Sequence, residues 1–146
     1  MRRRTLLAAS SLLLAGCAGS EPERPAIVFG SARWDAAVVP SPEAVFVVYL
    51  ADASGPEPPL EAALQRLTSP EPGAELVAYD TDQGALRSPH FFSLPVPAGK
   101  LDPSRDYVLR MAVVEQGRPV LVLAEPPLVL TRGRPRQVDV ALTPAS

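Results

Sequence analysis

Apolar residues in this chain fall into short runs in which side chains alternate between two faces. In residues 44–52 both faces are apolar, with Phe46 and Leu50 on one face and Val47 and Tyr49 on the other. A spacing of two residues is that of an extended strand, and a strand that is apolar on both faces is covered on both. The run therefore predicts a central strand of a β-sheet.

Similar alternation predicts further strands, which cover residues 26–34, 92–96, 107–115, 119–124 and 137–142. Residues Gln116–Arg118 separate two of these runs and indicate a tight hairpin. Pro95 has no backbone N–H to contribute to a sheet, so its strand is expected near an edge or an end.

One segment has the spacing of a helix instead. Within residues 59–69, Leu60, Ala63, Leu64 and Leu67 recur at i, i+3, i+4 and i+7, which places them on one helical face. We expect a short amphipathic helix here that packs onto the sheet as a crossover.

Proline content supports a fold built mainly from strands. The 146 residues include 18 prolines, more than twice the usual share of about 5%. Because proline breaks helix interiors and removes a ladder donor, prolines that mostly separate the apolar runs favour short strands joined by turns. We expect an all-β fold, namely an antiparallel two-sheet β-sandwich of about seven short strands with one short helix in a crossover.

The N-terminus carries the three parts of an export signal. Arg2–Arg4 form a basic region, residues 6–14 are apolar, and small residues follow. The apolar run is too short to cross a bilayer, which takes about 20 apolar residues. The end of the segment resembles the lipobox of bacterial lipoproteins, whose cysteine receives diacylglycerol before cleavage. The lipobox residues are Leu14, Ala15, Gly16 and Cys17.

Cys17 is the only cysteine of the chain, so no intramolecular disulfide can form. We expect it to be the acylated first residue of the mature protein, with this covalent lipid and no other cofactor. Each buried acyl methylene contributes about 0.8 kcal/mol, so two or more acyl chains hold a protein firmly on a membrane. The expected parts are a signal peptide (1–16), a lipidated cysteine and tether (17–25) and a β-sandwich domain (26–146).

The sequence allows two export routes and two destination membranes. The stretch from Arg3 to Leu7 resembles a relaxed twin-arginine signal, but an ordinary basic region is the preferred interpretation. Ala18 follows the cysteine where inner-membrane lipoproteins of enteric bacteria tend to carry aspartate. That resemblance favours the periplasmic face of the outer membrane, if the cell has two membranes.

The mature chain is acidic. Loss of residues 1–16 removes three arginines and leaves 14 − 3 = 11 basic against 16 acidic residues, a formal charge of 11 − 16 = −5. Nucleic acids and anionic lipid headgroups are bound by clustered Lys and Arg. We therefore expect no nucleic-acid partner, and contact with the membrane through the lipid anchor.

Candidate catalytic chemistry is sparse. His90 is the only histidine, and a hydrolase triad or a tetrahedral zinc site needs more partners than one histidine and an acylated cysteine provide. Residues Asp80–Gly84 alternate oxygen side chains as a calcium loop does, but the glycine is one place early and the closing glutamate is missing. We interpret them as a solvated turn. No catalytic residue and no metal site are predicted.

Ligand binding by aromatic side chains is the other possibility that the sequence offers. Trp34 and Tyr49 could form a small exposed patch, although core packing or a strand-end anchor is the preferred interpretation. Such a patch would suit a small ligand or a peptidoglycan fragment.

With the strands laid out, the order of motifs resembles the YbaY-like bacterial lipoproteins, which are related to the YscW-type lipoprotein chaperones (pilotins) of type III secretion. The motifs are the aromatic end of the first strand near Trp34 and the segments Val38–Val45, Leu50–Ser54, Phe92–Val96, Leu101–Tyr107 and Pro127–Gly133. Residues 55–86 depart from the pattern, because this segment is longer than the family's.

The resemblance implies a lipid-anchored β-sandwich without enzyme activity. Pilotin-type relatives bind a subunit of a secretin channel and bring it to the outer membrane, which requires an exposed apolar groove or a free strand edge. We expect a membrane-anchored, non-enzymatic binding or structural module of the cell envelope that recognises an envelope protein as a pilotin does. The alternative is a lipoprotein that binds a small ligand or peptidoglycan.

Overall fold

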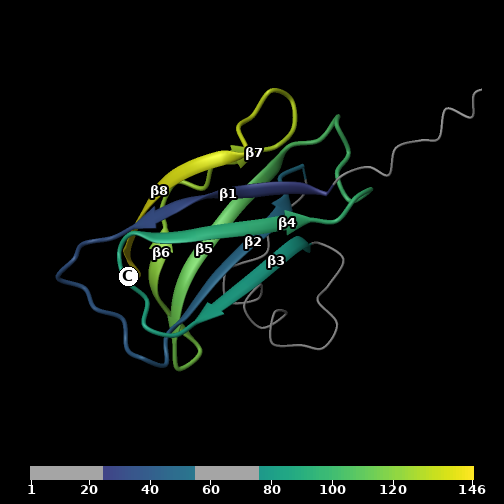
Figure 1. The fold of residues 1–146 in the computed structure, drawn as a ribbon. Coiled ribbons are helices and arrows are strands. Elements are labelled where there is room, and N and C mark those ends of the chain that lie inside the picture. The colour runs from purple at the N-terminus through teal and green to yellow at the C-terminus, as the bar shows by residue number, and fades with distance from the viewer. Residues whose placement is uncertain (1–24, 55–75) are drawn as a thin grey trace, which may run out of the picture.

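The computed structural model describes residues 25–54 and 76–146, and these residues contain strands and no helix (Figure 1). The eight strands are β1 (Ala26–Arg33), β2 (Val45–Asp52), β3 (Leu76–Gln83), β4 (His90–Val96), β5 (Tyr107–Glu115), β6 (Arg118–Leu123), β7 (Leu128–Val129) and β8 (Gln137–Pro144). The helix expected over residues 59–69 lies outside the described residues.

All eight strands belong to one sheet, in the order β3-β2-β5-β6-β8-β1-β4, with β7 beside β5. Every pair is antiparallel except β1 and β8, the first and last strands, which run parallel. The sheet curves until its two end strands, β3 and β4, approach each other, so it is nearly closed into a barrel (Figure 1). The all-β prediction is confirmed, but the purely antiparallel two-sheet sandwich is wrong, because the parallel β1–β8 pair joins both halves into one mixed sheet.

The main core lies inside this curved sheet. Alternate residues of each strand point inward, and the fully buried ones include Val28, Leu50, Leu94, Leu109 and Leu121. At about 25 cal/mol for each Å² of apolar surface removed from water, burial of these side chains is the principal stabilising contribution to the fold.

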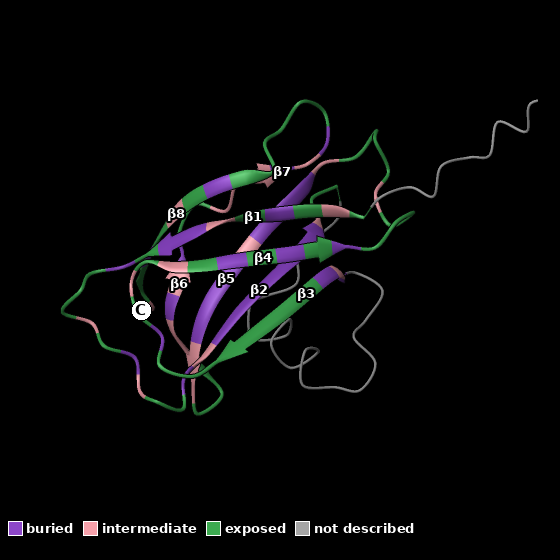
Figure 2. Ribbon diagram, in the orientation of Figure 1, coloured by how far each residue is buried: buried purple, intermediate pink, exposed green. Residues whose placement is uncertain are grey.

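A second apolar cluster covers the outer face of β2 and its neighbours. It contains Val47, Tyr49, Ala51, Leu76 and Val108, each less than 9% exposed. Figure 2 shows β2 buried along nearly its whole length. The prediction that this strand is central and covered on both faces is therefore confirmed.

Several local predictions are confirmed as well. The strand over residues 107–115 has the predicted bounds, and β4, which contains Pro95, is an end strand of the sheet. Gln116 and Gly117 both have positive φ, of 51° and 74°, as expected of the tight turn between β5 and β6.

Gly30 explains how the first and last strands come together. A Cβ atom at this position would lie 1.7 Å from the carbonyl oxygen of Val138, its partner on β8. The φ of Gly30 is also +156°, which residues with side chains rarely adopt. Only glycine permits this approach, so the residue is a structural requirement for the parallel pair.

An ion pair and several hydrogen bonds connect the loops at the end of β2 and the start of β5. Arg105 donates to Asp52 at 2.8 Å, and the same Asp52 carboxylate accepts hydrogen bonds from the backbone and hydroxyl of Ser54. The Ser54 bonds and then Arg105 lower the pKa of Asp52 from 3.8 to about 2. Tyr107 reinforces the same loop, because its hydroxyl oxygen accepts the N–H of Asp102 at 2.7 Å.

We expect the Asp52 interactions to make stability depend on acid pH. A carboxyl whose pKa is lowered in the folded state stabilises above its ordinary pKa, and this contribution is lost as the pH falls from 3.8 through about 2. In Asp52→Asn the free energy of unfolding should therefore fall less steeply over this range than in the wild type. Urea denaturation at a series of pH values measures the difference, and parallel curves for the two proteins would refute the assignment.

Candidate functional site

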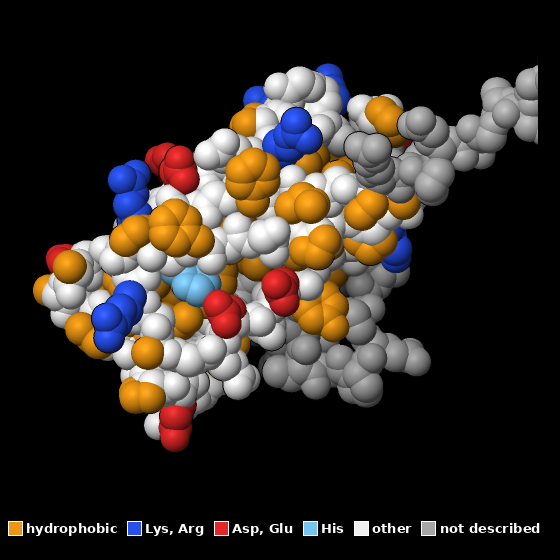
Figure 3. All heavy atoms as spheres, viewed as in Figure 1, with side chains coloured by type: hydrophobic (Ala, Val, Ile, Leu, Met, Phe, Trp, Pro, Cys, Tyr) orange, Lys and Arg blue, Asp and Glu red, His pale blue; other side chains and the backbone are white. Residues whose placement is uncertain are grey.

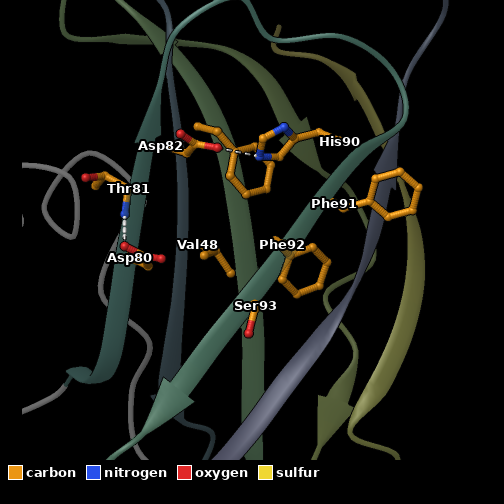
Figure 4. Close-up of a pocket in the computed structure, with 9 residues that line it drawn as sticks. Val48, Asp80, Thr81, Asp82, His90, Phe91, Phe92 and Ser93 are labelled. Atoms are coloured by element: carbon orange, nitrogen blue, oxygen red, sulfur yellow. Dashed lines mark hydrogen bonds and ion pairs between the residues drawn. The ribbon is translucent and has the colours of Figure 1, made fainter.

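A hollow of about 290 Å³ lies where the sheet fails to close, between β3 and β4 (Figure 4). We call it the seam pocket. Its lining residues are Phe46 and Val48 from β2, Asp80, Thr81 and Asp82 from β3, and His90, Phe91, Phe92 and Ser93 from β4. Neither β3 nor β4 has a second strand partner among the described residues. The pocket is thus bordered by two unpaired strand edges.

An aromatic floor closes the inner side of the seam pocket. The ring of Phe46 lies 4.4 Å from the ring of His90 and 6.4 Å from that of Phe92, measured between centroids. Phe46 and Phe92 belong to the main core and are 1% and 8% exposed. The floor is therefore part of the buried core, and a ligand in the pocket would contact the core directly.

The register of β2 and β3 explains why one wall of the pocket is acidic. Asp80 pairs with Val48 and Asp82 with Phe46 across β2 and β3, and cross-strand partners point to the same side of a sheet. Both aspartates therefore project to the interior side of the sheet, yet both are exposed, because no strand of the described residues covers them. The inner face of β3 thus changes from the buried Ala78 to two exposed acids.

His90 bridges the seam from β4. Its Nε2 atom lies 3.3 Å from an Asp82 carboxylate oxygen, and its side chain is 14% exposed (Figure 4). Burial lowers the pKa of His90, and the charge of Asp82 only partly opposes this. The neutral form of the imidazole is therefore favoured, and this form does not offset the negative charge of the wall. Among the described residues, no Lys or Arg forms an ion pair with Asp80 or Asp82.

An exposed aromatic side chain lies at the pocket on its β4 side. Phe91 is 74% exposed. Ile27 and Phe29, which are 43% and 38% exposed, lie farther away on the outer face of the neighbouring β1. In Figure 3 apolar side chains surround the histidine on this face, and two acidic side chains lie at its edge. An aromatic residue as exposed as Phe91 at the rim of a pocket is typical of a contact surface.

This arrangement is suited to binding. It offers unpaired backbone groups, an apolar floor and a negative wall, which together match an extended peptide. A hydroxyl nucleophile would need a base within about 2.6–3.2 Å. In the described part of the chain, the interaction found for His90 Nε2 is with Asp82, and no hydroxyl is hydrogen-bonded to this ring. Over the same residues, no group of three or more His, Cys, Asp or Glu side chains could hold a metal ion.

The structure separates the two aromatic residues that the sequence offered as a ligand patch. Trp34 is 7% exposed in the main core, with its indole N–H donating to the carbonyl of Val38 at 3.1 Å. Tyr49 is 1% exposed in the outer cluster. Because they lie on opposite sides of the sheet, they form no common surface. Cys17 and the rest of the lipobox lie outside the described residues.

The interpretation of Asp80–Gly84 as a solvated turn is wrong for most of its length. Asp80–Gln83 belong to β3, and only Gly84 lies beyond the strand. The signal was present in the sequence, because Val77, Tyr79 and Thr81 are strand-forming residues and aspartates two apart share one strand face. Because the second half of the strand is polar and exposed, its sequence resembles that of a turn.

Comparison with known proteins agrees with this fold. Residues 24–142 match the family of type III secretion system lipoprotein chaperones (YscW), and the chain therefore belongs to this family. No curated protein sequence matches the chain significantly. Among solved structures, an alternative pilotin from the type II secretion system of Vibrio cholerae is similar, with a TM-score of 0.67 and 18% sequence identity. The match covers 84% of this chain and 99% of that one.

Family membership confirms the predicted relation to YscW-type chaperones and with it the class of function, a lipoprotein chaperone. The likeness to the pilotin structure shows a shared fold. No helix of the described residues is long and apolar enough to cross a membrane.

Proposed function

We propose that the protein is a lipid-anchored pilotin that binds a secretin subunit and holds it at the periplasmic face of the outer membrane. The family match over residues 24–142 is the observation that carries this proposal. The seam pocket supports it, because a chaperone needs an accessible surface for another polypeptide and the two unpaired strand edges provide one.

Anchoring through Cys17 completes the proposal. A chaperone that delivers a protein to a membrane must itself be held there, and the lipobox from Leu14 to Cys17 supplies the attachment. Residues 18–25 are small, polar and rich in proline, which suits a spacer that lets the folded domain reach its partner.

Delivery of secretin multimers tests this function. In cells that lack the protein, the multimers should be depleted from outer-membrane fractions on a density gradient, and the wild-type protein should restore them. A Cys17→Ser variant should fold but fail to restore them, because the unanchored chaperone cannot hold its cargo at the membrane. Normal multimers in the outer membrane without the protein would refute the proposal.

Binding without catalysis is the second part of the proposal. The seam pocket does gather His90 with Asp80 and Asp82, which is the arrangement that favours an acid–base enzyme. We expect no hydrolysis of an activated ester such as p-nitrophenyl acetate above the rate of a His90→Ala variant. A rate that disappears in His90→Ala, while the folded fraction is unchanged, would instead make this pocket catalytic.

A further inference from the structure

We infer that the seam pocket receives an arginine side chain from an extended segment of the partner, and that this segment pairs with the free edge of β3. The inference rests on the proposed function and adds to it the chemistry of the recognised segment. It specifies a strand with a basic residue facing the pocket.

Charge complementarity identifies the basic residue. Asp80 and Asp82 project from β3 into the pocket, and no Lys or Arg among the described residues neutralises them (Figure 4). The Asp80 carboxylate accepts the backbone N–H of Thr81 at 2.9 Å, which leaves acceptor positions for a further donor. A guanidinium carries five N–H donors in a planar fork and can serve both carboxylates, whereas the ammonium of lysine is a point charge.

The floor suits the rest of an arginine side chain. Phe46, Val48 and Phe92 form an apolar surface beside the acidic wall. The methylene stem of arginine packs on apolar surface while its charged head stays near water. A purely apolar ligand would leave the two aspartates desolvated without partners, which costs free energy.

The β3 edge accounts for the extended conformation of the ligand. A strand that pairs with β3 places every second side chain on the inner side, directly opposite Asp80 or Asp82. An incoming arginine opposite Asp82 would displace His90 from its 3.3 Å contact. Since burial favours the neutral form of that imidazole, little ion pairing is lost when it moves away.

Binding of a matched pair of peptides tests the inference. The probes are acetyl-Thr-Val-Arg-Val-Thr-amide and the same peptide with citrulline, which keeps the shape of arginine but has no charge. Each is titrated into the acylated mature protein in detergent micelles, with backbone amide chemical shifts as the readout. The arginine peptide should shift β3 and β4 signals and bind at least about tenfold more tightly than the citrulline peptide, because its hydrogen bonds to carboxylates are charge-assisted.

Variants of the pocket provide the second arm. Asp80→Asn with Asp82→Asn should bring the affinity for the arginine peptide down to that for the citrulline peptide. The control is Glu43→Gln with Glu125→Gln, which removes two exposed acids away from the pocket and should leave the affinity unchanged. Thermal unfolding establishes that both double variants fold. Equal affinity for the two peptides, or shifts confined to strands other than β3 and β4, would overturn the inference.

Backbone pairing has its own control. An arginine peptide methylated at alternate backbone nitrogens cannot donate to the β3 edge, so it should bind at least about tenfold less tightly than its parent. Undiminished binding by the methylated peptide would eliminate the strand arrangement.

The same variants separate this inference from the proposed function. If secretin multimers need the protein but are delivered normally by Asp80→Asn with Asp82→Asn, the chaperone function stands and the arginine site is wrong. If the arginine peptide binds as expected but multimers do not need the protein, the site stands and its partner is a different protein.

Discussion

Replacing Gly30 by alanine should destabilise the protein by about 2–6 kcal/mol, because overpacking costs roughly 1–3 kcal/mol and a backbone region reserved for glycine costs roughly another 1–3 kcal/mol. The added Cβ would meet the carbonyl oxygen of Val138 at 1.7 Å, and that atom belongs to the backbone and cannot rotate away. Relief would require β1 and β8 to separate, which breaks the parallel pair that joins the two halves of the sheet.

Gly99→Ala is the matched control for this prediction. Gly99 also has a positive φ, of +80°, but nothing lies within 4 Å of the position of its Cβ. This substitution should cost only the left-handed backbone energy of about 1–2 kcal/mol. Urea denaturation of the two variants compares them directly. Equal losses of stability would mean that the close approach of β1 and β8 is not what Gly30 provides.

Truncation of Leu94 to alanine should cost about 2–5 kcal/mol, the range for leucines that leave a cavity in a packed core. Leu94 is 0% exposed and points into the core from β4, which pairs with β1 alone among the described strands. Ser93→Ala on the same strand should change stability by less than about 0.5 kcal/mol, since Ser93 is exposed on the opposite face. A small loss in Leu94→Ala would show that β4 is not anchored through the core.

Local alternation was sufficient to predict most strands. β2 is apolar on both faces, and β5 is nearly so apart from Arg110 and Glu115; their burial follows directly from the composition of residues 45–52 and 107–115. The same reasoning could not predict the sheet. The parallel pairing of β1 with β8 joins residues more than a hundred positions apart, and it depends on the missing side chain of Gly30 rather than on any periodic pattern.

The candidate site was only partly predictable for a related reason. His90 was recognised as the single histidine, but its neighbours Asp80 and Asp82 were assigned to a turn. Their strand, β3, lies at the end of the sheet, where no strand of the described residues covers its inner face. The second half of β3, Asp80–Gln83, therefore carries polar residues and lacks the alternation of a buried strand. Trp34 and Tyr49 show the opposite effect. Their aromatic character suggested a ligand-binding surface, but each is buried in a different apolar cluster, where it contributes to packing.

Inward-pointing acids on an end strand also admit a purely protective explanation, because charges there prevent unwanted edge-to-edge association. Removal of the acids distinguishes protection from recognition. Protection predicts that Asp80→Asn with Asp82→Asn self-associates, which light scattering detects, whereas recognition predicts a monodisperse protein that no longer binds the arginine peptide.

Crosslinking in living cells tests most directly whether the seam pocket is where this chaperone binds its partner. A photoreactive amino acid in place of Phe91, which is 74% exposed at the rim of the pocket, is compared with one in place of Glu125, an exposed residue beyond β6. We expect illumination to join the secretin subunit to the protein from position 91 and not from position 125. Equal adducts from both positions, or a secretin adduct from position 125 alone, would contradict a binding site at the seam.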